Sequence, residues 1–128
     1  MEHEEFLRLV HDTGGYEDDG TDEAVTTVLG LLGELLGTAS AEALADQLPE
    51  GLGDLVLPEP DTEAASWTAE GFLGRLAEAR DTTVDEAAVD ASAVLRTVAG
   101  AVDDSELDAL VTELPAGFSE LLGHPELT

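Results

Sequence analysis

The chain contains no lysine, cysteine, asparagine or isoleucine, and it has only four arginines and five aromatic residues. Without cysteine the protein has no disulfide, thiolate nucleophile or cysteine-bound metal, so its stability must come from packing. Nucleic acid is disfavoured as a partner because phosphate contacts require lysine and arginine. An anionic membrane surface is disfavoured for the same reason.

Long hydrophobic runs are missing as well. No stretch approaches the roughly 18 consecutive apolar residues of a membrane helix, and the N-terminal MEHEEF is acidic rather than basic and then apolar. We therefore expect neither a membrane span nor a signal peptide, and a cytoplasmic protein. The hydrophobic content of 43% is sufficient for the core of one compact domain over residues 1–128.

Negative charge is the strongest feature that is present. Thirty acidic residues give a formal net charge of −26, where a small domain usually carries a charge of about 2 to 8 in magnitude. A chain of this size exposes about 6,500 Å², so one unbalanced charge falls on about every 250 Å², roughly 16 Å from the next. Such neighbours repel when the Debye length is about 10 Å, at about 0.1 M salt, and hardly interact at about 1 M, where it is about 3 Å. The composition resembles cytoplasmic proteins of extremely halophilic archaea, and we expect dissolved K⁺ or Na⁺ as solvent partners.

High net charge with few aromatic residues also favours disorder, but a repeated apolar pattern argues against it. A shift of 66 residues pairs 4–56 with 70–122 without a gap and gives twelve identities. We therefore predict two copies of one unit, at about 1–57 and 67–123, joined by a linker at about 58–66 that is rich in proline and acidic residues. The identical pairs are Glu4/Glu70, Phe6/Phe72, Leu7/Leu73, Asp19/Asp85, Val28/Val94, Leu29/Leu95, Ala43/Ala109, Leu44/Leu110, Leu48/Leu114, Pro49/Pro115, Gly51/Gly117 and Leu55/Leu121.

Each copy is predicted to form four helices. The first covers about 2–12 or 68–80, where apolar residues fall on one side of a helix. The second, TDEAVTTVLGLLGELL in the first copy, carries an apolar stripe, and its partner opens with Thr83 and Glu86 as a capping box. The third opens with Ser40 or Asp103 as its N-cap.

A Leu-Pro pair is predicted to end the third helix of each copy. The residue before a proline is pushed out of the α region, so the helix must end at Leu48 or Leu114, and proline then suits the first turn of a short fourth helix. One unit alone buries its apolar faces poorly, so two copies should pack together. The predicted fold is all-α, a compact bundle of about eight helical segments built from two tandem four-helix repeats with approximate two-fold symmetry.

The stretches that carry this pattern, among them Glu5-Phe6-Leu7, EALADQLPEGLGDL and LPAGFSELL, resemble the domain of unknown function 2267 family. The resemblance covers nearly the whole chain and implies a small prokaryotic helical protein with no established activity and no catalytic motif. The second copy departs from the pattern by carrying Thr112-Glu113 where the first has Asp46-Gln47.

The histidines His3, His11 and His124 do not form a metal-binding pattern. A helical site requires spacings such as His-x-x-x-His or Glu-x-x-His, and neither occurs, although Glu120 and His124 stand four residues apart. We predict solvated histidines, no metal site and no cofactor.

The acidic run EDDGTDE, residues 17–23, could hold Ca²⁺ or Mg²⁺ through carboxylate oxygens. It does not fit the EF-hand template, because no glycine stands at the sixth position of a suitable loop. We favour a solvated loop in which Asp19 to Glu23 lead into a helix N-terminus, where negative charge is favourable. Divalent-cation binding stays open.

Other candidate features give weak signals. Thirty carboxylates form so many pairs that acid–base catalysis leaves no recognisable pattern, and no nucleophile elbow, phosphate loop or dinucleotide fingerprint occurs. Gly30, Gly33 and Gly37 would allow close helix approach at a cost of about 1 kcal/mol each inside a helix. Trp67 either joins the core, the commoner fate, or meets a partner.

We therefore expect a non-enzymatic helical scaffold or protein-interaction module adapted to high salt. It would bind another protein, or a second copy of itself, through an apolar groove between the repeats. The alternative is a small-molecule or divalent-cation binding protein with its site at the junction of the repeats. An enzyme is a third reading, for which no catalytic residue can be named.

Overall fold

The computed structural model describes residues 2–14, 18–49, 51–58, 66–115 and 117–123, which form helices and connecting turns and contain no strand. The first half comprises α1 (His3–Gly14), α2 (Asp18–Leu36), α3 (Thr38–Gln47) and α4 (Gly53–Val56). The second half comprises α5 (Ala69–Arg80), α6 (Val84–Ala101), α7 (Asp104–Glu113) and α8 (Phe118–Leu121). The prediction of an all-α fold with about eight helical segments is confirmed.

Helix starts in the second half follow the predicted capping chemistry. The backbone N–H of Glu86 donates to Thr83 Oγ1 at 3.2 Å, and that of Glu106 donates to Asp103 Oδ1 at 2.9 Å. Both side chains therefore satisfy an amide that the first turn leaves without an intrahelical partner. The carboxylate of Glu86 accepts from the Thr82 hydroxyl, so Thr83 acts as an N-cap while its predicted capping-box partner is engaged by the neighbouring residue.

Two boundaries of the first half differ from the prediction. Ser40 is not an N-cap, because α3 begins at Thr38 directly after Gly37. Gly37 has φ of 83°, a conformation that costs glycine little, and this residue alone separates α2 from α3. The predicted loop before the second helix is also wrong, since α2 begins at Asp18 and Asp19 to Glu23 already lie within it.

The predicted Leu-Pro corners are confirmed. Leu48 has φ −78° and ψ 155°, and Leu114 has φ −81° and ψ 152°, so each ends its helix in an extended conformation. Two residues after each proline, Gly51 and Gly117 have φ of 89° and 101°. The shared Leu-Pro-x-Gly motif is thus an extended residue, a proline and a left-handed glycine that together reverse the chain.

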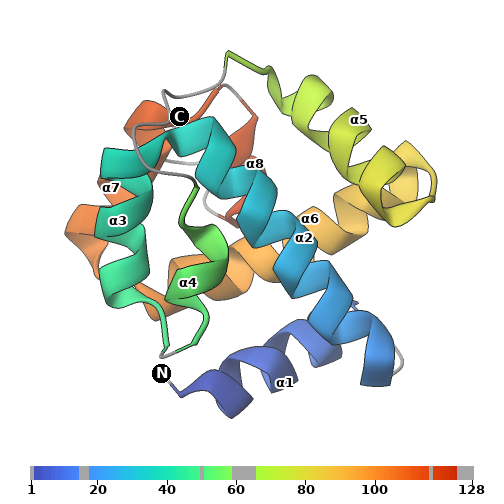
Figure 1. Ribbon diagram of the computed structural model, residues 1–128, viewed down its shortest axis with the longest axis horizontal. Helices are drawn as coiled ribbons and strands as arrows, with labels where there is room; N and C mark the ends of the chain where they lie inside the picture. Colours follow the sequence, from blue (N-terminus) through green and yellow to red (C-terminus); the bar gives the residue numbers. More distant parts are fainter. Residues whose placement is uncertain (1, 15–17, 50, 59–65, 116, 124–128) are drawn as a thin grey trace.

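Figure 1 shows α2 and α6 crossing at the centre, with α1 below, α5 at the upper right, and α3, α4, α7 and α8 gathered at the left. α1 and α5 each pack against both α2 and α6, and the two long helices contact each other. Helices from the two halves therefore share one hydrophobic core. Its largest fully buried side chains are Phe6, Phe72, Phe118, Leu29, Leu32, Leu44, Leu52, Leu76, Leu95, Leu110, Leu122 and Val10.

The surface area agrees with the expectation from chain length. The protein exposes 6782 Å², so the spacing of about 16 Å between unbalanced charges holds for the folded chain. No helix within the described ranges has the length and apolar character needed to cross a membrane.

Candidate functional site

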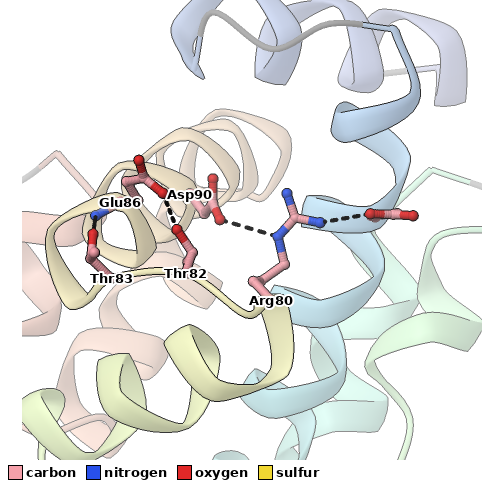
Figure 2. A network of polar contacts seen from close by, with 6 residues as sticks. Arg80, Thr82, Thr83, Glu86 and Asp90 are labelled. Atoms are coloured by element: carbon pink, nitrogen blue, oxygen red, sulfur yellow. Dashed lines mark hydrogen bonds and ion pairs between the residues drawn. The ribbon is translucent and has the colours of Figure 1, made fainter.

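A buried ion pair joins the two halves of the chain. Arg80, the last residue of α5, donates from Nε to Asp90 Oδ2 at 3.2 Å and from Nη1 to Glu23 Oε2 at 3.1 Å. The Arg80 and Asp90 side chains are 15% and 9% exposed, whereas Glu23 on α2 is 77% exposed. Figure 2 shows the guanidinium between the two carboxylates. A buried carboxylate is costly unless it is paired, so Arg80 and Asp90 depend on each other.

The turn between α5 and α6 holds Arg80 in this position. Asp81 adopts the left-handed conformation with φ 55° and ψ 52°, and its N–H donates to carbonyls of the last turn of α5. Thr83 then caps α6, and Thr82 donates to Glu86 (Figure 2). The chain therefore reverses within three residues, which brings the end of α5 beside Asp90 on the first turns of α6.

Hollows lie on both sides of the Arg80 side chain. On the α6 side, a hollow of about 380 Å³ is lined by Gly14, Arg80, Asp81, Thr82, Glu86, Val89 and Asp90. On the α2 side, one of about 410 Å³ is lined by Asp22, Glu23, Thr26, Thr27, Ala79 and Arg80.

The α2-side hollow continues along α2. Thr26, Thr27 and Ala79 also line a larger hollow of about 650 Å³, to which Gly30, Leu31, Glu34, Leu57 and Pro58 contribute. We call these two adjoining hollows the α2–α5 groove. It is bordered by a long helix of the first half and the end of α5 from the second half, and its far end is largely apolar.

A second contact between the halves joins α3 to the start of α7. Gln47 Nε2 donates to Asp103 Oδ2 at 3.2 Å, and the backbone N–H of Asp103 donates to Gln47 Oε1 at 2.7 Å. This pairing explains the departure of the second copy from the family pattern: Gln47 reaches across to the N-cap of α7, whereas Glu113 in its place in the second half could only accept hydrogen bonds.

Acidic side chains of α7 line the same seam. Glu106 and Glu113 border a small hollow of about 280 Å³ with Ala39, Ser40 and Ala43 of α3. Burial raises the pKa of the Glu106 carboxyl, and the negative charges of Glu113 and Asp103 raise it further. Each of these causes disfavours the charged carboxylate.

The histidines occupy different surroundings. His3 is exposed and lies beside Gly51, at 3.1 Å from its Nδ1 to an ideal Cβ position of that glycine. His11 is half-buried, with its Nδ1 3.7 Å from Asp12 Oδ1. His124 lies outside the described residues.

Parts of the acidic run 17–23 are described and parts are not. Glu17 and the side chains of Asp18 and Asp19 lie outside the described residues, while Asp22 and Glu23 are exposed on α2. Among the side chains that the structure does describe, no group of three or more histidines and carboxylates could hold a metal ion.

The remaining sequence candidates have packing roles. Trp67 is half-buried against the core, and the Arg75 guanidinium lies 4.3 Å from the centre of its ring. Gly33 permits close helix approach as predicted, because a Cβ there would lie 1.7 Å from the Val56 carbonyl oxygen. Gly30 does not, since a Cβ there would meet nothing within 4 Å.

The sequence reasoning missed the Arg80–Asp90 pair. A signal was present: Asp90 falls on the apolar face of its helix, three residues after buried Ala87 and four before buried Val94. A charge in such a stripe requires a partner, and arginine is rare in this chain. Which arginine serves could not be read from the sequence, because the connection depends on the turn at Asp81.

A comparison with known families agrees with this architecture. The family model described as "Uncharacterized conserved protein (DUF2267)" matches residues 3–121 and thus all eight helices. No curated protein matches the chain. The match confirms the resemblance noted in the sequence, and the chain belongs to the DUF2267 family.

Proposed function

We propose that the protein is a non-enzymatic helical scaffold, an interaction module that binds another protein through the α2–α5 groove. The observation that carries this proposal is the composition of the groove, in which Leu31, Leu57 and Pro58 provide apolar surface beside the paired Arg80. Leu57 is 41% exposed, among the largest exposed fractions of any large hydrophobic side chain described. Apolar surface rimmed by polar groups is typical of interaction sites.

We further propose that the halves are copies of one four-helix unit, so that the groove lies at their junction. The helices of the two halves follow in the same order with lengths of 12 and 12, 19 and 18, 10 and 10, and 4 and 4 residues. Each of the last three helices begins 65 or 66 residues after its counterpart, as the first does. Superposition of the two halves tests this point.

Because the chain has no cysteine, the groove can be tested by site-specific photo-cross-linking. A cross-linker on Thr27→Cys, in the groove, should give a discrete protein adduct in a host lysate at about 2 M KCl. The same reagent on Ser105→Cys, exposed on α7, is the control and should not give that adduct. Identical adducts from both positions, or none from Thr27→Cys, would refute the proposal.

Adaptation to a salt-rich cytoplasm is part of the same proposal and is supported by the net charge of −26 on 6782 Å² of surface. We expect the helical signal in circular dichroism to rise steeply between low and molar KCl, since added ions screen repulsion between neighbouring carboxylates. Full helicity in dilute buffer would count against it.

The α6-side hollow favours a second candidate function, binding of a small molecule at the junction. Its specific support is the buried Arg80–Asp90 pair in the wall, beside left-handed Asp81. Binding sites often combine a concave surface with a few convergent polar groups. Thermal stabilisation by one metabolite at constant KCl, lost in Arg80→Met, would support this candidate, and no stabilisation across a metabolite panel would remove it.

A further inference from the structure

We propose that the occupant of the α2–α5 groove is an amphipathic helix of another protein that carries arginine or lysine beside its apolar stripe. This inference rests on the proposed function and names the class of partner. It follows from three features of the groove, which are its direction, its floor and its charge.

The direction of the groove suits a helix. Thr26 or Thr27, Gly30 or Leu31, and Glu34 stand at helical spacing, so the groove runs along α2 for roughly 12 Å. Leu57 and Pro58 border the same hollow. A helix laid along such a groove places the apolar residues of successive turns between the two borders.

Gly30 forms an open floor that the fold itself does not require. A Cβ at position 30 would meet no atom within 4 Å, whereas one at Gly33 would collide with the backbone of Val56. The position 66 residues further along α6 holds Arg96, so a helix in the matching place accepts a long side chain. Glycine inside a helix is unfavourable, and at a helix surface it lets another backbone approach closely.

The charge of the rim selects a basic partner. Asp22, Glu23 and Glu34 line the groove, and within the described ranges only Glu23 of the three pairs with a cation, Arg80. In molar salt the Debye length is about 3 Å, so only charges in direct contact matter. Arginine or lysine flanking the apolar stripe would meet Asp22 and Glu34 directly, and carboxylates there would repel them.

The test uses two fluorescent peptides of about 18 residues with a helical leucine stripe, one flanked by arginines and one by glutamates. Binding to the full chain is measured by anisotropy at about 2 M KCl. The arginine peptide should bind, and Gly30→Leu, which fills the floor, should weaken it at least about 10-fold. Gly100→Leu is the matched control, because a Cβ at Gly100 on α6 also meets nothing within 4 Å, and it should leave binding unchanged.

Each other outcome overturns the inference. Equal affinity for both peptides removes the basic partner, and binding unaffected by Gly30→Leu removes the groove. A dimer that forms in the wild type and is lost in Gly30→Leu would assign the groove to a second copy of the chain. If neither peptide binds while the Thr27→Cys adduct persists, the partner class is wrong and the interaction function stands; loss of the adduct refutes the function itself.

Discussion

The corner formed by α2, α3 and α4 is built differently from its counterpart formed by α6, α7 and α8. In the first half, α4 packs closely against both α2 and α3. In the second half, α8 packs against α6, and over the described residues α7 makes no comparably extensive backbone approach to any helix. The same sequence of helices therefore encloses a tight corner once and a looser one the second time.

Side-chain volume at matching positions accounts for the difference. Each position of the first corner that we compare holds a smaller residue than the one 66 places later. The pairs are Gly33/Ala99, Ala41/Leu107, Ala45/Val111, Leu52/Phe118, Gly53/Ser119 and Val56/Leu122.

The two corners thus reach a packed interior by different means. In the first, glycines let backbones touch, since a Cβ at Gly53 would lie 2.8 Å from the Ala45 carbonyl oxygen. In the second, larger side chains fill the space, and Phe118 packs edge-on against Phe72 with ring centres 5.1 Å apart. Packing density can be kept by close backbones or by volume.

The largest effect expected is from Gly33→Ala. A Cβ at this position would lie 1.7 Å from the Val56 carbonyl oxygen, so α4 must move away from α2. We expect the free energy of unfolding to fall by about 3 kcal/mol, the upper part of the range for overpacking, measured by thermal melting at constant KCl. Gly30→Ala is the control on the same helix and should stabilise by about 1 kcal/mol. Similar melting of the two variants would contradict the close-contact account.

Ser119→Ala should strengthen the looser corner. The Ser119 side chain is 2% exposed, and its hydroxyl is a buried group for which the described structure shows no hydrogen-bond partner. Removing such a group should stabilise by about 1 kcal/mol. Thr97→Val is the control, because the buried Thr97 hydroxyl donates to the Ala93 carbonyl at 2.8 Å, and it should give no gain. A loss of stability in Ser119→Ala would show that the hydroxyl has a partner.

The prolines offer a milder comparison of the corners. Pro49 is buried and Pro115 is only half-buried, so Pro49→Ala loses more packing as well as the restriction that proline places on the unfolded chain. We expect a loss of about 1 kcal/mol for Pro49→Ala and less for Pro115→Ala, by thermal melting. Unchanged melting of both would show that the corners do not depend on proline.

The smallest effect expected concerns the acidic seam between α3 and α7. The pKa of Glu106 is raised in the folded state, so its stabilising contribution is present below the unfolded value of 4.5 and is lost as pH rises through the folded pKa. Glu106→Gln should therefore stabilise by about 0.5 kcal/mol at neutral pH. The difference should disappear as pH is lowered below that value, and a difference that persists there would contradict the electrostatic cause.

Much of the fold could be predicted from local sequence, and most of the site could not. The Leu-Pro corners at Leu48 and Leu114 and the caps Thr83 and Asp103 depend on backbone sterics and on hydrogen bonds within a few residues. Ser40 was wrongly taken as a cap because the left-handed state of Gly37 ended one helix and started the next without a loop.

The contacts between the halves depend on distances that local sequence does not encode. Arg80 meets Glu23 across 57 residues, and Gln47 meets Asp103 across 56. The roles of Gly30 and Gly33 also differ although they stand on one helix, since one faces a groove and the other the backbone of α4.

The sequence by itself determined the all-helical architecture and the chain reversals, because apolar periodicity, caps and proline act over a few residues. Only the tertiary structure decided which helices touch, which of four arginines pairs with buried Asp90, and which glycine leaves a groove open. These depend on how helices far apart in the chain fill shared space, and the volume of six paired positions made one corner tight and the other loose.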